Sequence, residues 1–221
     1  MENIPYMREW LGYHIHLGVD KFFLYDNSKA VTSEWKKRYD TLISEKNNKY
    51  GLRFDCYGLS EKQVEEQWRE IWADYYEHIV VIRWEPHNEN GEIIYGQVKS
   101  LEHYTSHFKN TIKYTSFIDT DEFIFSTNYL NIYEYLEKAE MNNLTHIKMR
   151  NRHYAARSCV RNKRVTEIED YLPELSSSDT LNIPNYTWDA KSIVVTKYYV
   201  IGPSIHMGRV SYGNTKIEDF D

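Results

Sequence analysis

Three acidic side chains fall within four positions near the middle of the chain. Asp119, Asp121 and Glu122 lie between two apolar, aromatic-rich runs. Residues 114–118 are aromatic and β-branched, which predicts a buried strand that leads into the acids. Because residues two apart on an extended chain face the same side, we expect Asp119 and Asp121 to point together and Thr120 to point away.

Two convergent carboxylates form a hard-oxygen site suited to Mg²⁺ or Mn²⁺, which bind one or two carboxylates together with substrate phosphates. A polar turn after a strand is the simpler interpretation, since an Asp-x-Asp pattern alone is common. The hydrophobic frame favours the metal site, because acids placed there carry a burial cost unless a ligand compensates them. We expect Glu122 to face a neighbouring basic residue or the outer shell of the metal rather than an acceptor.

Composition limits the classes of protein to consider. The chain has 221 residues, of which 41% are hydrophobic and 15% aromatic, so we expect a single domain over residues 1–221 with a substantial core. Its formal net charge of −6 argues against a nucleic-acid partner. No apolar run approaches the roughly 18 residues of a membrane span, and the first residues do not read as a signal peptide. Cys56 and Cys159 are too few for a disulfide framework, which fits a cytoplasmic location, with the membrane surface as an alternative.

The order of elements predicts an α/β fold. Apolar periodicity and turn residues indicate helices over 4–17, 32–43, 61–77, 97–109 and 130–140, and strands over 21–25, 52–57, 79–84, 114–118, 146–149 and 193–201. Gly18 should end the first helix. Strands that alternate with helices imply a sheet covered by helices. The stripe through Trp68 and Trp72 is interpreted as an added core helix, with a lid on the acceptor side as the alternative.

Two histidines one helical turn apart, His103 and His107, are a second candidate for metal binding. They could hold zinc from one helix face, but Tyr104 follows His103, where the metalloprotease pattern has a glutamate. A histidine pair at the surface or core rim is the better interpretation. Glycine-rich phosphate-binding loops do not occur in the sequence.

Several blocks of the chain resemble a glycosyltransferase signature. Glu2, the run Tyr6-Met7-Arg8-Glu9-Trp10-Leu11-Gly12-Tyr13-His14 and the run from Gly18 to Ser28 resemble the opening of glycosyltransferase family 92-like domains and their family 2-type GT-A relatives. The segment from Phe117 to Phe125 resembles their metal-binding D-x-D-E-F segment. Further matches follow in the family's order: Gln97, the block Ile168-Glu169-Asp170-Tyr171, the block Lys191-Ser192-Ile193-Val194, and His206.

The resemblance implies a GT-A (Rossmann-like) nucleotide-sugar-binding fold with a mostly parallel sheet flanked by helices. It implies a metal-dependent hexosyltransferase that moves a hexose from a nucleotide-diphosphate sugar, in particular a UDP-sugar, to a glycan or glycoconjugate acceptor. The roles that it implies are metal binding (Mn²⁺ or Mg²⁺) for Asp119, Asp121 and His206, donor binding for Asp26, Glu2 and Lys191, and catalysis facing the acceptor for Glu169.

Two departures from the family pattern keep other functions open. The family's first strand precedes the glutamate matched by Glu2, whereas only Met1 precedes it here, so we expect an N-terminally truncated domain whose first strand is missing. Residues 45–78 are also long for the link that they replace. A non-catalytic carbohydrate- or nucleotide-binding module on the same fold is therefore the alternative. A metal-dependent phosphoryl-transfer enzyme is a third hypothesis, because the Asp-x-Asp chemistry is shared.

Overall fold

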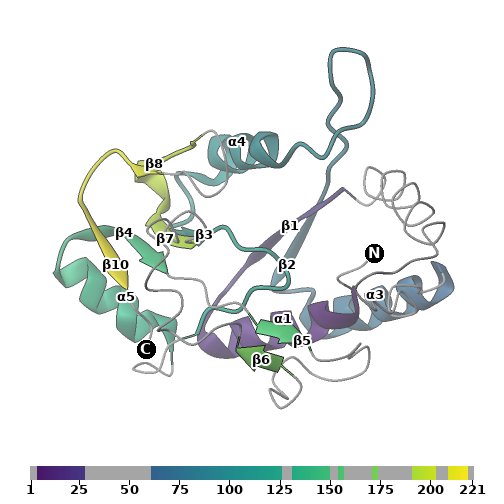
Figure 1. Ribbon diagram of the computed structural model, residues 1–221, viewed down its shortest axis with the longest axis horizontal. Coiled ribbons are helices and arrows are strands. Elements are labelled where there is room, and N and C mark those ends of the chain that lie inside the picture. Colours follow the sequence, from purple (N-terminus) through teal and green to yellow (C-terminus); the bar gives the residue numbers. More distant parts are fainter. Residues whose placement is uncertain are drawn as a thin grey trace. The chain divides into compact units, whose positions relative to one another are not determined.

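A computed structural model of the chain describes residues 4–27, 61–125, 131–149, 154–156, 171–173, 191–202 and 209–218 (Figure 1). Within these ranges the protein is a mixed α/β structure. The helices are α1 (Ile4–Leu17), α3 (Glu61–Tyr75), α4 (Gln97–Phe108), α5 (Ile132–Met141) and the 3-10 helix η4 (Thr196–Tyr198). The strands are β1 (Phe22–Asp26), β2 (Ile79–Arg83), β3 (Tyr114–Ser116), β4 (Leu144–Met149), β5 (Tyr154–Ala156), β6 (Tyr171–Pro173), β7 (Lys191–Val195), β8 (Tyr199–Val200), β9 (Arg209–Val210) and β10 (Asn214–Glu218).

The chain divides into two compact units. The first comprises Met1–Leu11, Asp20–Gly96 and Ala156–Asp170, and the second comprises Gly12–Val19, Gln97–Ala155 and Tyr171–Asp221. The helix expected over 32–43, the strand expected over 52–57, and both cysteines lie outside the described residues. The helices predicted over 4–17, 61–77, 97–109 and 130–140 are confirmed with small shifts of their ends.

A pair of parallel strands forms the sheet of the first unit. β1 pairs with β2 from Phe22 opposite Ile79 to Asp26 opposite Arg83. Phe22 and Ile79 are buried, as the apolar runs predicted. Both strands end at the same edge of the pair, so Asp26 and Arg83 lie side by side at the carboxyl ends.

Helix α3 buries only part of the apolar stripe that runs through Trp68 and Trp72. Ile71 is 1% exposed, whereas Trp72 is 47% exposed. Arg8 of α1 pairs with Asp74 at 2.5 Å and with Glu70 at 3.5 Å at the surface of α3. The core-helix interpretation therefore holds for Ile71, but Trp72 remains at the surface.

The connection after β2 is a self-contained loop over residues 84–96, drawn at the top of Figure 1. The Asn88 side chain accepts hydrogen bonds from the backbone N–H groups of Asn90 (3.0 Å) and Glu92 (2.9 Å). Gly91 has a φ of +78°, and a Cβ there would meet nothing within 4 Å. At the base of the loop, the Trp84 indole donates to the carbonyl oxygen of Gly96 at 3.2 Å. Local hydrogen bonds thus fix both the tip and the base.

The second unit contains a four-stranded sheet in the order β10-β4-β7-β3. β10 pairs with β4 in parallel, but β7 runs antiparallel to both β4 and β3. The expectation of a mostly parallel sheet is therefore wrong for this sheet, which is mixed, because β7 enters between β4 and β3 in the opposite direction. The single final strand predicted over 193–201 is also wrong: η4 separates β7 from β8, and β9 and β10 follow.

The end of α1 is built as the sequence predicts. Gly18 has a φ of +107°, its N–H donates to the Ile15 carbonyl at 3.0 Å, and the next N–H donates to the His14 carbonyl at 2.8 Å. This is a Schellman cap, which needs a residue that tolerates positive φ. A Cβ on Gly18 would also lie 2.8 Å from the side chain of Asn131, which caps α5 by accepting from the Tyr133 N–H at 2.8 Å.

The core of the second unit lies between α5 and the sheet, and one residue each from α1 and from the segment after β3 completes it. Its buried members are Leu17, Ile124, Tyr135, Leu136, Ala139, Ile147, Met149 and Ile193. In Figure 1, α5 lies beside the β4–β10 part of the sheet. Ile124 belongs to this core, so the segment that carries Asp119 and Asp121 is anchored in it.

Several polar groups buried in the same unit are paired with one another. The hydroxyl groups of Tyr104, Thr115 and Thr196 form a chain with oxygen–oxygen distances of 2.9 and 2.7 Å. His146 on β4 is 2% exposed, and its Nε2 lies 3.0 Å from Oγ of Ser192. Burial, and secondarily the charge of Lys148, lowers the pKa of His146 to about 4. The imidazole is therefore neutral at physiological pH.

Candidate metal and donor site

The acidic segment forms a turn rather than the end of a strand. β3 stops at Ser116, and the N–H of Glu122 donates to the Asp119 carbonyl at 3.1 Å. In return, the Asp119 N–H donates to Oε2 of Glu122 at 2.9 Å. This reciprocal pair of bonds closes residues 119–122 and competes with extension of the strand. The expectation of an extended backbone from Asp119 to Asp121 is therefore wrong, because Thr120 and Asp121 occupy the centre of a turn.

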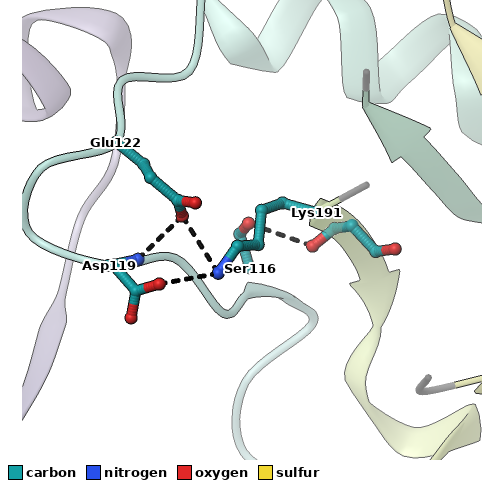
Figure 2. Close-up of polar contacts among 5 residues, drawn as sticks. Ser116, Asp119, Glu122 and Lys191 are labelled. Atoms are coloured by element: carbon teal, nitrogen blue, oxygen red, sulfur yellow. Dashed lines mark hydrogen bonds and ion pairs between the residues drawn. The ribbon is translucent and has the colours of Figure 1, made fainter. Parts of the chain in front are cut away.

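A buried lysine holds this turn against the sheet. The Nζ of Lys191 lies 2.9 Å from Oδ2 of Asp119 and 3.1 Å from Oε2 of Glu122, and the Lys191 side chain is 3% exposed (Figure 2). Strand pairing brings it there: Ser116 lies opposite Ile193 in the antiparallel β3–β7 pair, so Lys191 follows beside the residues after β3. The Ser116 hydroxyl, which donates to the Ser192 carbonyl at 3.0 Å, extends that pairing.

Burial affects the Glu122 carboxyl of the turn. Burial raises the pKa of the Glu122 carboxyl above its usual range, although the hydrogen bond from Asp119 and the charge of Lys191 oppose that shift. The Asp119 side chain is 50% exposed and that of Glu122 is 28% exposed. The expectation that Glu122 faces a basic residue is confirmed, and the ammonium group of Lys191 balances two acids at once.

Replacing Lys191 with methionine should destabilise the protein more than breaking a surface pair. The change leaves two carboxylates beside each other without a cation, which costs about 3–5 kcal/mol for a buried pair and less where the acids are partly exposed; we therefore expect about 2 kcal/mol. Urea titration monitored by circular dichroism measures this loss.

Lys113→Met is the matched control for Lys191→Met. Lys113 also pairs with a glutamate, Glu140, at 2.7 Å, but both side chains are more than half exposed. Its loss should cost much less than the loss of Lys191, because solvent screens an exposed pair. Equal losses for the two variants would show that burial of Lys191 does not strengthen its contacts.

The turn presents oxygen atoms of the kind that a hard divalent cation prefers. Asp121 is exposed, and Oγ1 of Thr120 is buried with no hydrogen-bond partner among the described residues. Among the residues that the structure describes, no group of three or more His, Cys, Asp and Glu side chains could hold a metal. One or two carboxylates are nevertheless enough for Mg²⁺ or Mn²⁺ when substrate phosphates complete the shell. Asp121 and the outer oxygen of Asp119 are the groups that would hold it.

The other predicted site residues lie elsewhere or are not described. Asp26 is exposed at the carboxyl end of β1, in the β1–β2 sheet of the first unit, whereas Asp119 and Asp121 follow β3 in the second. Their meeting at one sheet edge stays a prediction. Glu2, Glu169 and His206 lie outside the described ranges.

The histidine pair on α4 is arranged as a stacked surface pair. The rings of His103 and His107 have centroids 4.1 Å apart at an interplanar angle of 25°. Nδ1 of His107 lies 2.8 Å from the backbone carbonyl oxygen of His103. Burial, followed by the charge of His107, lowers the pKa of His103. The interpretation as a rim pair agrees with this geometry.

The resemblance implied donor binding for Lys191, and its ion pairs with the acidic turn were not predicted. The two segments are 72 residues apart, and only the strand register brings them together. One signal was present: Lys191 is the single charged residue of the strand Lys191–Val195, which ends in three apolar residues.

Comparisons with protein-family models, with curated proteins and with solved structures find no match to this chain. No described helix has both the length and the apolar character needed to cross a membrane.

Proposed function

We propose that the protein is a metal-dependent glycosyltransferase with a GT-A-like fold, which transfers a hexose from a nucleotide-diphosphate sugar to a glycan or glycoconjugate. The observation that carries the proposal is the Asp119–Glu122 turn, where a buried lysine holds the half-exposed Asp119 and the Asp121 carboxylate is exposed. The resemblance of this segment and of residues 6–28 to family 92-like and family 2-type domains supports the same activity.

The residues have separate roles in this proposal. A divalent ion held at Asp121 and Asp119 would stabilise the negative charge that develops on the diphosphate leaving group. Lys191 keeps Asp119 in place and lowers the net negative charge where a diphosphate would approach. Asp26, at the carboxyl end of a parallel strand pair, is suited to the nucleoside, because ligands of α/β sheets gather beyond these ends. His206 as a further metal ligand and Glu169 as the group facing the acceptor belong to the same proposal.

A binding module without catalysis is the second candidate, and one observation favours it. Lys191 already supplies a cation to Asp119 and Glu122 at 2.9 and 3.1 Å. Such a turn could bind a sugar or nucleotide without any metal.

Thermal unfolding with a panel of nucleotide sugars, with and without Mn²⁺, tests the proposal. A ligand at about 100 times its Kd stabilises the native state by about 2.7 kcal/mol. The glycosyltransferase predicts stabilisation that needs both Mn²⁺ and a nucleotide sugar, followed by slow release of the nucleotide diphosphate. Stabilisation that is independent of metal and not followed by release would support the binding module, and no response to any nucleotide sugar would contradict both.

A further inference from the structure

The main chain of Ile124 is held at both of its polar groups by two adjacent residues of α1. The Tyr13 hydroxyl donates to the Ile124 carbonyl oxygen at 2.8 Å, and the Ile124 N–H donates to Nε2 of His14 at 3.2 Å. The Phe123 ring stacks on the His14 imidazole, with centroids 5.7 Å apart and an angle of 22°. It also packs edge-on against the Tyr13 ring at 5.2 Å. All four residues belong to the second unit.

Burial makes these contacts hard to replace. His14 is 0% exposed and Ile124 is 8% exposed, so water does not substitute for a lost partner at either group. A backbone N–H can only donate, and therefore Nε2 of His14 accepts and carries no proton. The neutral imidazole with its proton on Nδ1 is the form that fits.

Ile124 comes two residues after Glu122, so the acidic segment is fixed on both sides. Lys191 holds Asp119 and Glu122, and α1 holds the chain immediately beyond them. We infer that Tyr13 and His14 are positioning residues, whose hydrogen bonds to Ile124 set the backbone of the Asp119–Glu122 turn and thereby the direction of the Asp121 carboxylate. The inference rests on the proposed function in one respect, which is that the turn binds a divalent cation. Ligand-binding groups that are held in place before binding lose less entropy when they bind.

Two measurements on the full chain test the inference. Hydrogen exchange in a peptide that covers residues 119–125, followed by mass spectrometry without metal, reports how firmly the segment is held. Titration of Mn²⁺ alone, followed by electron paramagnetic resonance, reports the affinity of the turn. Tyr13→Phe and His14→Leu should speed exchange in this peptide and weaken Mn²⁺ binding by about five- to tenfold, the effect of one lost hydrogen bond.

Two further variants separate positioning from general stability. His14→Gln keeps an acceptor near the position of Nε2 and should restore both readouts toward wild type. Tyr104→Phe also removes one buried tyrosine hydroxyl, whose bond to Thr115 is 2.9 Å long, and should leave exchange in 119–125 and Mn²⁺ affinity at wild-type values. Should His14→Leu fail to fold, Tyr13→Phe, which removes a single oxygen atom, decides the question.

Different results would refute the positioning role and the proposed metal site. Wild-type exchange in residues 119–125 of Tyr13→Phe would overturn the positioning role. So would faster exchange with unchanged Mn²⁺ affinity in a wild type that binds Mn²⁺. A wild-type protein that binds no Mn²⁺ would instead refute the metal site, while the exchange data still decide whether Tyr13 and His14 hold the segment.

Discussion

Asp121→Ala should abolish metal-dependent nucleotide binding and leave the fold intact. Asp121 is exposed at the centre of the turn, and no hydrogen bond or ion pair of its side chain occurs within the described part of the chain, so its loss should change the free energy of unfolding by no more than about 0.5 kcal/mol. Changes to outer-shell partners of a metal cost about 10–100-fold in affinity, and loss of a direct ligand should cost at least about 100-fold. Titration with Mn²⁺ and a UDP-sugar, together with urea unfolding, gives both quantities.

Asp119→Ala should differ from Asp121→Ala in one measurable way. It removes an oxygen ligand and also an acid paired with the buried Lys191, so both affinity and stability should fall. Glu137→Gln, an exposed acid on α5, is the control and should change neither. Full Mn²⁺ binding by Asp121→Ala would contradict the assignment of this turn as the metal site.

Acidification should destabilise the protein through His146. Its pKa is lowered from 6.5 to about 4 in the folded state, first by burial, so the unfolded chain takes up a proton before the folded one does. Stability is therefore full above pH 6.5 and is lost as the pH falls toward the folded pKa near 4. One pKa unit corresponds to about 1.4 kcal/mol, so His146 should account for about 3 kcal/mol of lost stability over this range.

Comparison of wild type with His146→Gln isolates this contribution from that of other titrating groups. Glutamine can still pair with Ser192 and Thr215, the hydroxyl neighbours of His146, but it does not ionise. The difference in free energy of unfolding between the two proteins, measured by urea titration at each pH from 7 to 4, should change by about 3 kcal/mol. His16→Gln, which replaces an exposed imidazole on α1, should follow the wild type. Parallel curves for wild type and His146→Gln would show that His146 does not set the acid limit.

The elements that depend on local sequence signals could be predicted from the sequence. The helix over α1 follows from its apolar spacing, and its end follows from Gly18, because a Schellman cap favours a residue that tolerates positive φ. The strands around Phe22 and Ile79 were also predicted, since each apolar run is too short for a typical helix and is bounded by turn residues.

The features that depend on distant segments or on competing hydrogen bonds could not be predicted from the sequence. The direction of β7 depends on its partners β3 and β4, and no local pattern carries that information. An extended strand would point the side chains of Asp119 and Asp121 to the same face of the sheet. Instead, the hydrogen bond from the Asp119 N–H to the Glu122 carboxylate closes a turn. Such side-chain-to-backbone bonds compete with strand formation wherever acids cluster.

The loop over residues 84–96 offers a practical point of attachment for probes. Its tip is closed by the side chain of Asn88, and Gly91 faces open space, so a probe carried at this tip would not press on packed atoms. Exposed tips of this kind are where chains best accept insertions and new termini. An epitope, a lanthanide-binding tag or a single cysteine for a fluorophore could therefore be placed there to follow ligand binding, without altering any residue of the Asp119–Glu122 turn.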